Sequence, residues 1–287
     1  MTCAANAGYA CELVSLGAFL DRSDKVGAVE VRQCRHCGHG VTFPPLADVA
    51  FLYGDRESQD YQPDTRNTLA RRIKDIAFRR QARTLLRQIG NPGAQALDFG
   101  CGSGQFTRVM GELIPATRLT GSDFFDAPPP DLAGRPYAHS DVIAQQPDRY
   151  DLIMAMHVLE HDDDVDGLLA RIVRPARSGG TVVIEVPNIE CFWGKVFGRF
   201  WDAWYLPFHR SHFSRRSLTA LLRRHGLEIT AVHGLTVPTM GRTAANLFGR
   251  RNNLFWLLIG IALHPLQLLG EALSGQKTVI RVIARKR

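Results

Sequence analysis

The 287-residue sequence lacks several features that would place it quickly in a functional class. Its first ten residues, MTCAANAGYA, contain no basic segment followed by an apolar run. No signal peptide is therefore visible, and we expect a cytoplasmic protein. Only six residues are cysteine, and without an export signal we expect their thiols to be reduced.

A strong excess of charge of one sign is also missing. Lys and Arg number 35 against 28 Asp and Glu, which gives a net charge of +7. This balance is compatible with acidic substrates, anionic membrane surfaces or nucleic acid, and it does not choose among them. An apolar content of 45% and a charged content of 22% are typical of a globular protein with a buried core. The length allows one large domain, or one domain with an appendage.

The most informative stretch is 96–106, which reads ALDFGCGSGQF. An apolar run ends in Asp98, a turn with three glycines follows, and the next residues can form a helix. Such a strand, turn and helix start present free N–H groups to a ligand at the carboxyl end of the strands. The dinucleotide pattern G-x-G-x-x-G is absent, because Gln105 stands sixth when counted from Gly100. An acid before the first glycine favours a ligand with a positive centre over a pyrophosphate.

This D-x-G-x-G-x-G stretch resembles the first motif of class I S-adenosylmethionine-dependent methyltransferases. The phrase H-V-L-E-H at 157–161, after a strand that begins Y-D-L-I, resembles the same family, as do G-G-x-V-V-I-x-V-P-N at 179–188 and P-x-H-x-x-H-F-S at 207–214. The resemblance covers about residues 30–287. It implies an enzyme that uses S-adenosylmethionine. It also implies an α/β fold, namely a Rossmann-like three-layer α/β/α sandwich around a seven-stranded mixed sheet with an antiparallel last strand.

The resemblance also implies which residues hold the cofactor. Asp123 ends the second predicted strand, where a carboxylate can accept both hydroxyls of a ribose, and Phe124 is placed to touch the adenine ring. We expect a third strand over 137–142, with Asp141 at its end near the adenine amino group. The complete expected set is Asp98, Phe99, Gly100, Cys101, Gly102, Gly104, Asp123, Phe124, Asp141 and Met156.

Four histidines are candidate catalytic residues. His157 and His161 follow a predicted buried strand at 152–156, in a turn that this family places beside the cofactor sulfur. An imidazole can take a proton from a substrate hydroxyl as the methyl group transfers. His209 and His212 lie in a predicted substrate lid over 188–215, where they act as a base or a hydrogen-bond donor, or else belong to a buried polar network.

Residues 1–45 contain four of the six cysteines, and we expect a small ribbon-like appendage there, before a methyltransferase domain over 46–287. Cys34 and Cys37 have the C-x-x-C spacing that lets two thiolates bind one metal. Cys3 and Cys11 are candidates for a second pair, although their spacing is wide. A knuckle that ends in C-x-x-C-G-x-x-x-x-x-P resembles the start of methyltransferases that act on sugars and other small molecules. Zinc is therefore a candidate cofactor; the alternative is a degenerate ribbon held by packing alone.

Two further stretches suggest contacts outside the site. Residues 68–89 predict a helix with one apolar face and a strongly basic remainder. The basic part is either a solvated face or a binding surface for an anionic substrate or membrane. Residues 254–273 are apolar, but His264-Pro265 interrupts them before the ~20 residues that a membrane span requires. We interpret 250–275 as an insertion that caps the substrate pocket, lies in a membrane interface, or forms an ordinary crossover helix or dimer face.

These features predict an S-adenosylmethionine-dependent methyltransferase with a small-molecule acceptor: a sugar, a polyketide or other secondary metabolite, or a lipid-linked glycan. The alternatives are a membrane-peripheral methyltransferase of a lipid or quinone, and a non-catalytic cofactor-binding scaffold. A nucleic-acid partner is not expected, because the N/D-P-P-Y/F motif of enzymes that methylate base amines is absent after the fourth strand, where the sequence reads M-H-V-L-E-H. Oxygen, nitrogen and carbon acceptors all remain open.

Overall fold

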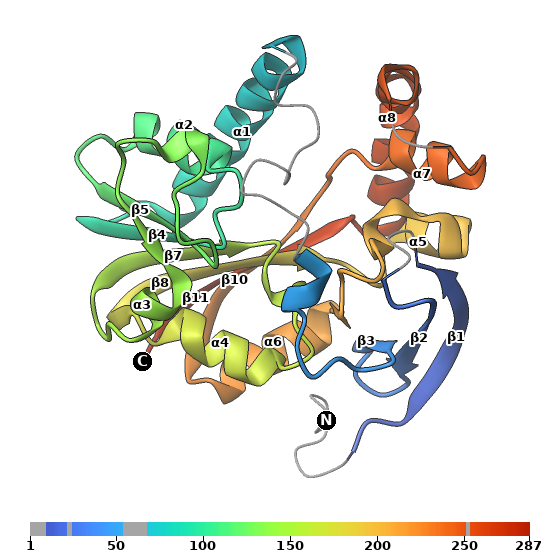
Figure 1. Ribbon diagram of the computed structural model, residues 1–287, viewed down its shortest axis with the longest axis horizontal. Coiled ribbons are helices and arrows are strands. Elements are labelled where there is room, and N and C mark those ends of the chain that lie inside the picture. Colours follow the sequence, from blue (N-terminus) through green and yellow to red (C-terminus); the bar gives the residue numbers. More distant parts are fainter. Residues whose placement is uncertain (1–9, 22–24, 54–67, 251–252) are drawn as a thin grey trace.

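The structure is a computed structural model, and it describes residues 10–21, 25–53, 68–250 and 253–287. Its centre is a seven-stranded sheet with the order β10-β11-β8-β7-β4-β5-β6 (Figure 1). Strand β11 runs antiparallel to both of its neighbours, and the pairs among β8, β7, β4, β5 and β6 are parallel. The strands are β4 (Gln95–Phe99), β5 (Arg118–Asp123), β6 (Tyr137–His139), β7 (Tyr150–Met156), β8 (Ala176–Pro187), β10 (Leu227–Leu235) and β11 (Val279–Lys286).

Helices cover both faces of this sheet, which confirms the predicted three-layer sandwich (Figure 1). On one face, α1 (Thr68–Ile89) and α2 (Gln105–Leu113) bury Leu85 and Met110 against the strands. On the other face, α4 (Val165–Val173) and α6 (Arg215–Arg224) bury Leu169 and Leu222, beside the short α3 (Ser140–Ala144). The central strands β7 and β8 contain the apolar runs 152–156 and 182–184, because both of their faces are covered.

A second, smaller sheet holds the N-terminal segment. It consists of β1 (Leu13–Leu20), β2 (Ala28–Cys34), β3 (Gly40–Phe43) and β9 (Ser211–His212), with every neighbouring pair antiparallel. The first three strands lie within residues 1–45, where we expected a ribbon-like appendage, and the fourth lies within residues 188–215, where we expected a lid. The appendage is therefore hydrogen-bonded to the lid across the boundary expected at residue 45.

The lid and the late apolar segment form a helical layer beside the small sheet. The lid contains α5 (Phe192–Phe197) and the short helices η4 (Gly198–Phe200) and η5 (Asp202–Trp204). Its tryptophans pack with Phe19 and Val29 of the small sheet. After β10 come α7 (Met240–Leu247) and the long α8 (Leu254–Ser274), which stands at the upper right of Figure 1. The remaining short helices are η1 (Ala50–Tyr53), η2 (Pro130–Leu132) and η3 (Leu159–His161).

Two local predictions are wrong. The strand expected over 137–142 ends at His139, because the His139 ring accepts the Asp141 amide at 3.2 Å and caps the start of α3. The interruption expected at His264-Pro265 does not occur, since α8 continues through Pro265 to Ser274. Proline removes one backbone donor from a helix interior, and the buried side chains of the following turns hold the second half of α8 in place.

Candidate active site

The glycine turn after β4 has a backbone that only glycine adopts without strain. Gly100, Gly102 and Gly104 have φ of 75°, 54° and 74°. The amides of Gly100 and Cys101 both donate to the carbonyl of Ser122 on β5, at 2.7 and 2.9 Å. A Cβ atom on Gly100 would lie 2.3 Å from Val158. The turn is therefore fixed in its shape by β5 on one side and by the turn after β7 on the other.

Two buried carboxylates flank this turn. Asp98 accepts the hydroxyl of Thr107 at 2.6 Å, and Asp123 accepts the amides of Gly102 and Phe124 at 2.7 and 2.8 Å. Burial raises the pKa of Asp98 to about 7, and the charge of Asp123 adds to the rise although the Thr107 hydrogen bond opposes it. Burial also raises the pKa of Asp123. No Lys or Arg in the described part of the chain forms an ion pair with Asp98, so the site favours a ligand that brings a positive charge.

Aromatic rings lie next to these carboxylates. The Phe124 side chain, 43% exposed, follows the end of β5, and its ring centroid is 5.7 Å from that of Tyr53. Tyr53 also lies 5.6 Å from Phe208 of the lid.

The other predicted cofactor residues are placed less directly. The side chain of Phe99 packs in the core, so a ligand at the strand end would meet its backbone. Cys101 is buried, and burial raises the pKa of its thiol. Met156 ends β7, with its sulfur 3.9 Å from the side-chain amide of Gln81. Asp141 lies in the first turn of α3, exposed to solvent and paired with Arg171.

His157 is held as a cation between two carboxylates. Its Nδ1 lies 3.2 Å from Glu160 Oε1 and its Nε2 lies 3.4 Å from Glu185 Oε1. Burial lowers the pKa of His157, but these two contacts outweigh burial and raise it to about 10. Glu185 also pairs with the fully buried Arg281, whose Nε lies 2.8 Å from Glu185 Oε2. The cluster therefore contains two cations and two carboxylates; Glu160, Glu185 and Arg281 are buried, whereas the His157 side chain is 39% exposed.

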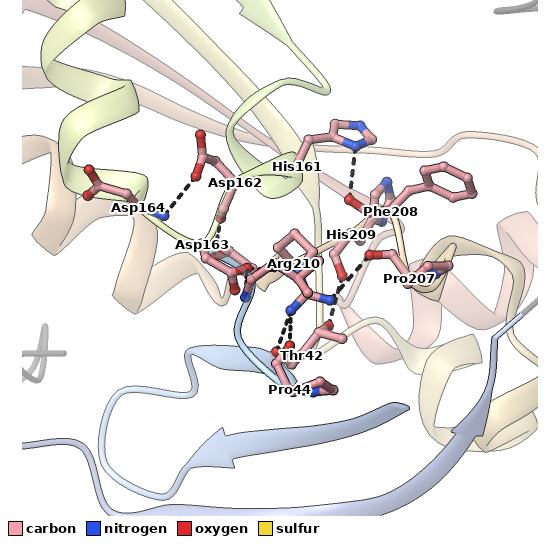
Figure 2. A network of polar contacts seen from close by, with 12 residues as sticks. Thr42, Pro44, His161, Asp162, Asp163, Asp164, Pro207, Phe208, His209 and Arg210 are labelled. Atoms are coloured by element: carbon pink, nitrogen blue, oxygen red, sulfur yellow. Dashed lines mark hydrogen bonds and ion pairs between the residues drawn. The ribbon is translucent and has the colours of Figure 1, made fainter. Parts of the chain in front are cut away.

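His161 has a different environment. Its Nδ1 lies 3.1 Å from the carbonyl oxygen of Phe208 and 2.8 Å from the hydroxyl of Tyr53, and Figure 2 shows the ring above the Phe208–His209 segment. A carbonyl oxygen can only accept a hydrogen bond. A hydrogen bond to the Phe208 carbonyl therefore favours the tautomer with the proton on Nδ1 and the lone pair on Nε2, although the Tyr53 hydroxyl, which can donate as well as accept, also contacts Nδ1.

His209 and His212 are buried within the predicted lid, and each has a ring nitrogen in a hydrogen bond. His209 Nδ1 donates to the carbonyl of Ala203 at 3.0 Å. The hydroxyl of Thr42 donates to the carbonyl of His209, so His212 Nε2, 2.9 Å away, donates to that hydroxyl. Burial holds the pKa of His209 well below its usual value and lowers that of His212 to about 3. Both rings are neutral members of a buried polar network.

Comparison with known proteins agrees with this geometry. Residues 69–232, more than half of the chain, match a family model described as a methyltransferase domain. The chain belongs to this family. It is a class I S-adenosylmethionine-dependent methyltransferase, and the family supports an enzyme over a non-catalytic scaffold.

Several proteins are similar to the methyltransferase over part of its length. The ubiquinone biosynthesis O-methyltransferase of Pseudomonas savastanoi pv. phaseolicola is 25% identical over 166 residues, which cover 52% of this chain and 71% of that protein. The trans-aconitate 2-methyltransferase of an Acidovorax species is 30% identical over 115 residues, 38% of this chain and 45% of that protein. The crystal structure of a Burkholderia thailandensis 1,6-didemethyltoxoflavin-N1-methyltransferase with S-adenosylhomocysteine shares the fold, with a TM-score of 0.52, 19% identity and coverage of 86% of this chain and 95% of that one.

The glycine turn and its carboxylates fit the cofactor of the methyltransferase. S-adenosylmethionine carries a sulfonium and an ammonium group and no phosphate. Asp98 and Asp123 are the buried acids beside the turn, and the close approach of Val158 to Gly100 leaves room for backbone only. A buried carboxylate such as Asp98, with no protein cation paired to it in the described residues, is compatible with a ligand that carries a positive charge.

One residue that the sequence analysis did not select, Arg210, joins the lid to the rest of the methyltransferase. Its side chain is fully buried, and its Nε lies 2.9 Å from Asp163 Oδ2 (Figure 2). Its Nη2 donates to the carbonyls of Thr42, at 3.0 Å, and Pro44. Two features of the sequence could have pointed to Arg210. It stands between His209 and His212, and the run of three aspartates at 162–164 offers a partner for its charge.

The predicted metal residues of the N-terminal segment come together in part. The sulfurs of Cys11, Cys34 and Cys37 all lie within 4.8 Å of one another, and those of Cys11 and Cys37 are 3.9 Å apart. Burial opposes ionisation of the Cys34 thiol, but amide hydrogen bonds from Cys37 and His36 lower its pKa to about 7. Cys3 lies outside the described residues.

Proposed function

We propose that the methyltransferase transfers a methyl group to a hydroxyl oxygen of a small-molecule acceptor, with His161 as the general base. The observation that carries the proposal is the hydrogen bond from His161 Nδ1 to the Phe208 carbonyl. It favours the tautomer with the proton on Nδ1 and the lone pair on Nε2, at the turn beyond β7. The relatives named for ubiquinone biosynthesis and for trans-aconitate support a small-molecule acceptor.

The other three histidines fit the role of base less well. His157 already holds a second proton at neutral pH, because two carboxylates raise its pKa to about 10. His209 and His212 are neutral, but each has a ring nitrogen committed to a backbone or hydroxyl partner and is buried. We assign these two to the support of the lid, and we assign to His157 the orientation of the turn that contains His161.

The proposed reaction needs a base only at the acceptor oxygen. S-adenosylmethionine supplies a methyl group on a positively charged sulfur. The acceptor oxygen forms a bond to the methyl carbon, the carbon–sulfur bond breaks with its electron pair left on sulfur, and the hydroxyl proton moves to His161 Nε2. Tyr53, 2.8 Å from His161 Nδ1, and the Phe208 carbonyl hold the ring in orientation. We assign the remaining rate enhancement to placing the oxygen in line with the methyl group.

We assign the cofactor to the turn after β4. Asp123 would hold the ribose hydroxyls, Asp98 would face the positive groups, and Phe124 would cover the adenine ring. The backbone of 99–104 and the end of β7 at Met156 form the floor. Asp141 is engaged with Arg171, so an adenine contact from Asp141 requires that this exposed ion pair opens, at a cost of about 0–1 kcal/mol.

The test compares His161→Ala with a control, His225→Ala, whose ring pairs with Asp166 on the surface. Release of S-adenosylhomocysteine is measured with a panel of diphenols, sugars and polyketides at saturating cofactor. Loss of a general base lowers kcat about 10²–10⁴-fold, and we expect this for His161→Ala alone, with unchanged cofactor affinity by calorimetry. Unchanged turnover in His161→Ala would contradict the assignment.

A second acceptor class is a lipid or quinone reached at a membrane surface. The specific observation in its favour is the exposed apolar face of α8, on the same side of the molecule as the lid helix α5 (Figure 1). Enzyme assays with the same head group on a short and a long alkyl chain separate the two classes. A water-soluble acceptor predicts equal kcat/KM for both.

We also propose that Cys11, Cys34 and Cys37 bind zinc as thiolates, with a fourth ligand from elsewhere. The clustering of the three sulfurs and the lowered pKa of Cys34 support this, because thiolates are the preferred ligands of structural zinc. Elemental analysis of protein purified without chelator should give about one zinc per chain, and a Cys34→Ser variant should lose it. Absence of zinc, together with a Tm unchanged by added zinc, would contradict the zinc site and favour the alternative, a degenerate ribbon held by packing alone.

A further inference from the structure

Helix α8 buries the polar side chains of Gln267 and Glu271 and exposes most of its large apolar ones. The inward stripe is formed by Trp256, Gly260, Leu263, Gln267 and Glu271, and the last two are 0% and 1% exposed. The outward positions have no charged residue. Its large exposed side chains are Leu254, Phe255, Leu257, Leu258, Ile261, Leu266, Leu268, Leu269 and Leu273, each between 42% and 81% exposed.

This distribution is the reverse of an ordinary surface helix, which turns its apolar stripe to the core. Within the described residues, α8 is also the one helix long and apolar enough to cross a bilayer on length and composition. Neighbouring elements expose further apolar side chains, because Leu247 at the end of α7, Phe248 after it and Val196 of α5 are 47%, 67% and 54% exposed. So many exposed apolar side chains on adjoining elements mark a binding surface.

The contacts of α8 with the body show that it lies along the protein. Gln267 Nε2 donates to the Val237 carbonyl at 2.8 Å and to Glu271 at 2.9 Å. Glu271 also accepts hydroxyls of Thr236 and Thr278, just beyond β10 and just before β11. Near the other end of α8, Gly260 packs directly on Gly241 of α7. Polar anchors in the second half of α8 and the Gly260–Gly241 packing in the first half hold α8 against the rest of the fold, so it does not span a bilayer.

The elements around α8 carry cations and no exposed carboxylate. Residues 191–200 contain Lys195 and Arg199, and residues 240–250 contain Arg242 and Arg250; all four are exposed. The acid in the adjoining η5, Asp202, is mostly buried and pairs with Arg242, and Glu271 is buried within α8. This combination matches an anionic bilayer surface, in which hydrocarbon lies beneath negative head groups. A second copy of the chain would bring like charges together.

We propose that the outward face of α8, with Leu247, Phe248 and Val196, docks into the interface of an anionic membrane. Helix α8 then lies in the plane of the membrane, with a length of about 31 Å. Lys195, Arg199 and Arg250 meet the lipid head groups. Because α5 belongs to the lid, docking places the lid at the membrane surface. This inference concerns where the enzyme binds and does not depend on the base or on the acceptor class.

The experiment is flotation of the full-length protein with vesicles of neutral phosphatidylcholine and with vesicles that contain 30% phosphatidylglycerol. We expect binding to the anionic vesicles that is at least about tenfold stronger than to the neutral ones. The double substitution Leu258→Glu and Ile261→Glu should reduce binding to anionic vesicles more than about tenfold. The matched control is Leu16→Glu, which places one charge at a 43% exposed leucine on β1; it should bind as the wild type does.

Further measurements distinguish a membrane from a second copy of the chain as the partner of the outward face of α8. Arg199→Glu with Arg250→Glu should weaken binding to anionic vesicles and leave binding to neutral vesicles unchanged. Circular dichroism and calorimetry with S-adenosylhomocysteine establish that every variant is folded and binds cofactor. A wild-type protein that stays with neither vesicle would overturn the proposal. A wild-type dimer that does not float, and that Leu258→Glu separates in sedimentation velocity, would assign the face to a second copy.

Discussion

The buried carboxyl of Asp98 predicts that cofactor affinity depends on pH near neutrality. Its pKa is about 7 in the protein without cofactor, because burial and the neighbouring Asp123 charge disfavour ionisation. The ordinary value of an aspartate is 3.8, so the folded protein retains this proton between about pH 4 and pH 7. A sulfonium and an ammonium group interact favourably with the ionised form only, so binding must expel the proton.

The size of the effect follows from the fraction of Asp98 that is ionised. With a pKa of about 7, roughly one tenth is ionised at pH 6 and roughly three quarters at pH 7.5, so the apparent affinity should rise about eightfold over this interval. At pH 6.5 binding should release about three quarters of a proton per chain. Calorimetry in two buffers of different ionisation enthalpy measures both quantities.

The decisive variant is Asp98→Asn, which keeps an acceptor for the Thr107 hydroxyl at 2.6 Å but has no proton to lose. Its cofactor affinity should be lower than that of the wild type at pH 7.5 and nearly flat with pH. Asp126→Asn, an exposed acid after β5, serves as the control and should behave as the wild type does. A wild-type affinity that is constant between pH 6 and 7.5, or a slope that survives in Asp98→Asn, would refute the reasoning.

Three other outcomes follow from the same geometry. The pKa of His157 in the folded protein, about 10, lies above its unfolded value, so the stability that protonated His157 contributes is complete below pH 6.5 and is lost as pH rises towards 10. Because the side chain is 39% exposed, we expect a change of only about 1 kcal/mol in the free energy of unfolding measured with urea. This dependence of stability on pH should be absent in His157→Gln. Gly100→Ala should weaken cofactor binding more than tenfold in calorimetry, whereas Gly134→Ala, with φ of 72° but open space around it, should cost only about 1 kcal/mol of stability and retain binding. Arg210→Met leaves buried partners without a cation and should lower the unfolding free energy by about 3–5 kcal/mol, against little change for the exposed Arg215→Met; equal unfolding midpoints would argue against the role given to Arg210.

The central sheet and the cofactor turn could be predicted because their signals are local. The apolar strand before Asp98, the three glycines and the acid at the end of β5 each follow from a few adjacent residues, and parallel strands bring their carboxyl ends to one edge. Helix α1 agrees with its predicted bounds of 68–89 because the 3.6-residue pattern ends at Asn91-Pro92-Gly93. The run of three aspartates at 162–164 directly precedes α4, where Asp164 accepts the Gly167 amide at 3.0 Å and caps the helix.

Features that depend on distant residues could not be predicted. The charge state of His157 depends on Glu185, which is 28 positions later on β8 and whose own pKa is held low by His157 and Arg281 despite its burial. Strand β9 has only two residues, which is too short to show the alternation of apolar and polar residues typical of a strand. Its pairing with β3 could therefore not be predicted from the sequence. Helix α8 continues through Pro265 because Gln267 and Glu271 anchor its second half. In the sequence these two polar residues only interrupt the apolar stretch, so they did not indicate that the helix continues.

The shared N-terminal sheet has a consequence for the order in which the chain becomes structured during synthesis. Thr42 and His212, which are hydrogen-bonded across it, are separated by 170 positions. At ribosomal rates of roughly 5–20 residues per second, the edge of β3 waits about 10–30 seconds for its partner strand to emerge. Throughout that time the first three strands expose an unpaired edge, which is a template for association with other nascent chains. The small sheet therefore closes only after β4 to β8 have emerged, although β1 to β3 precede them in the chain.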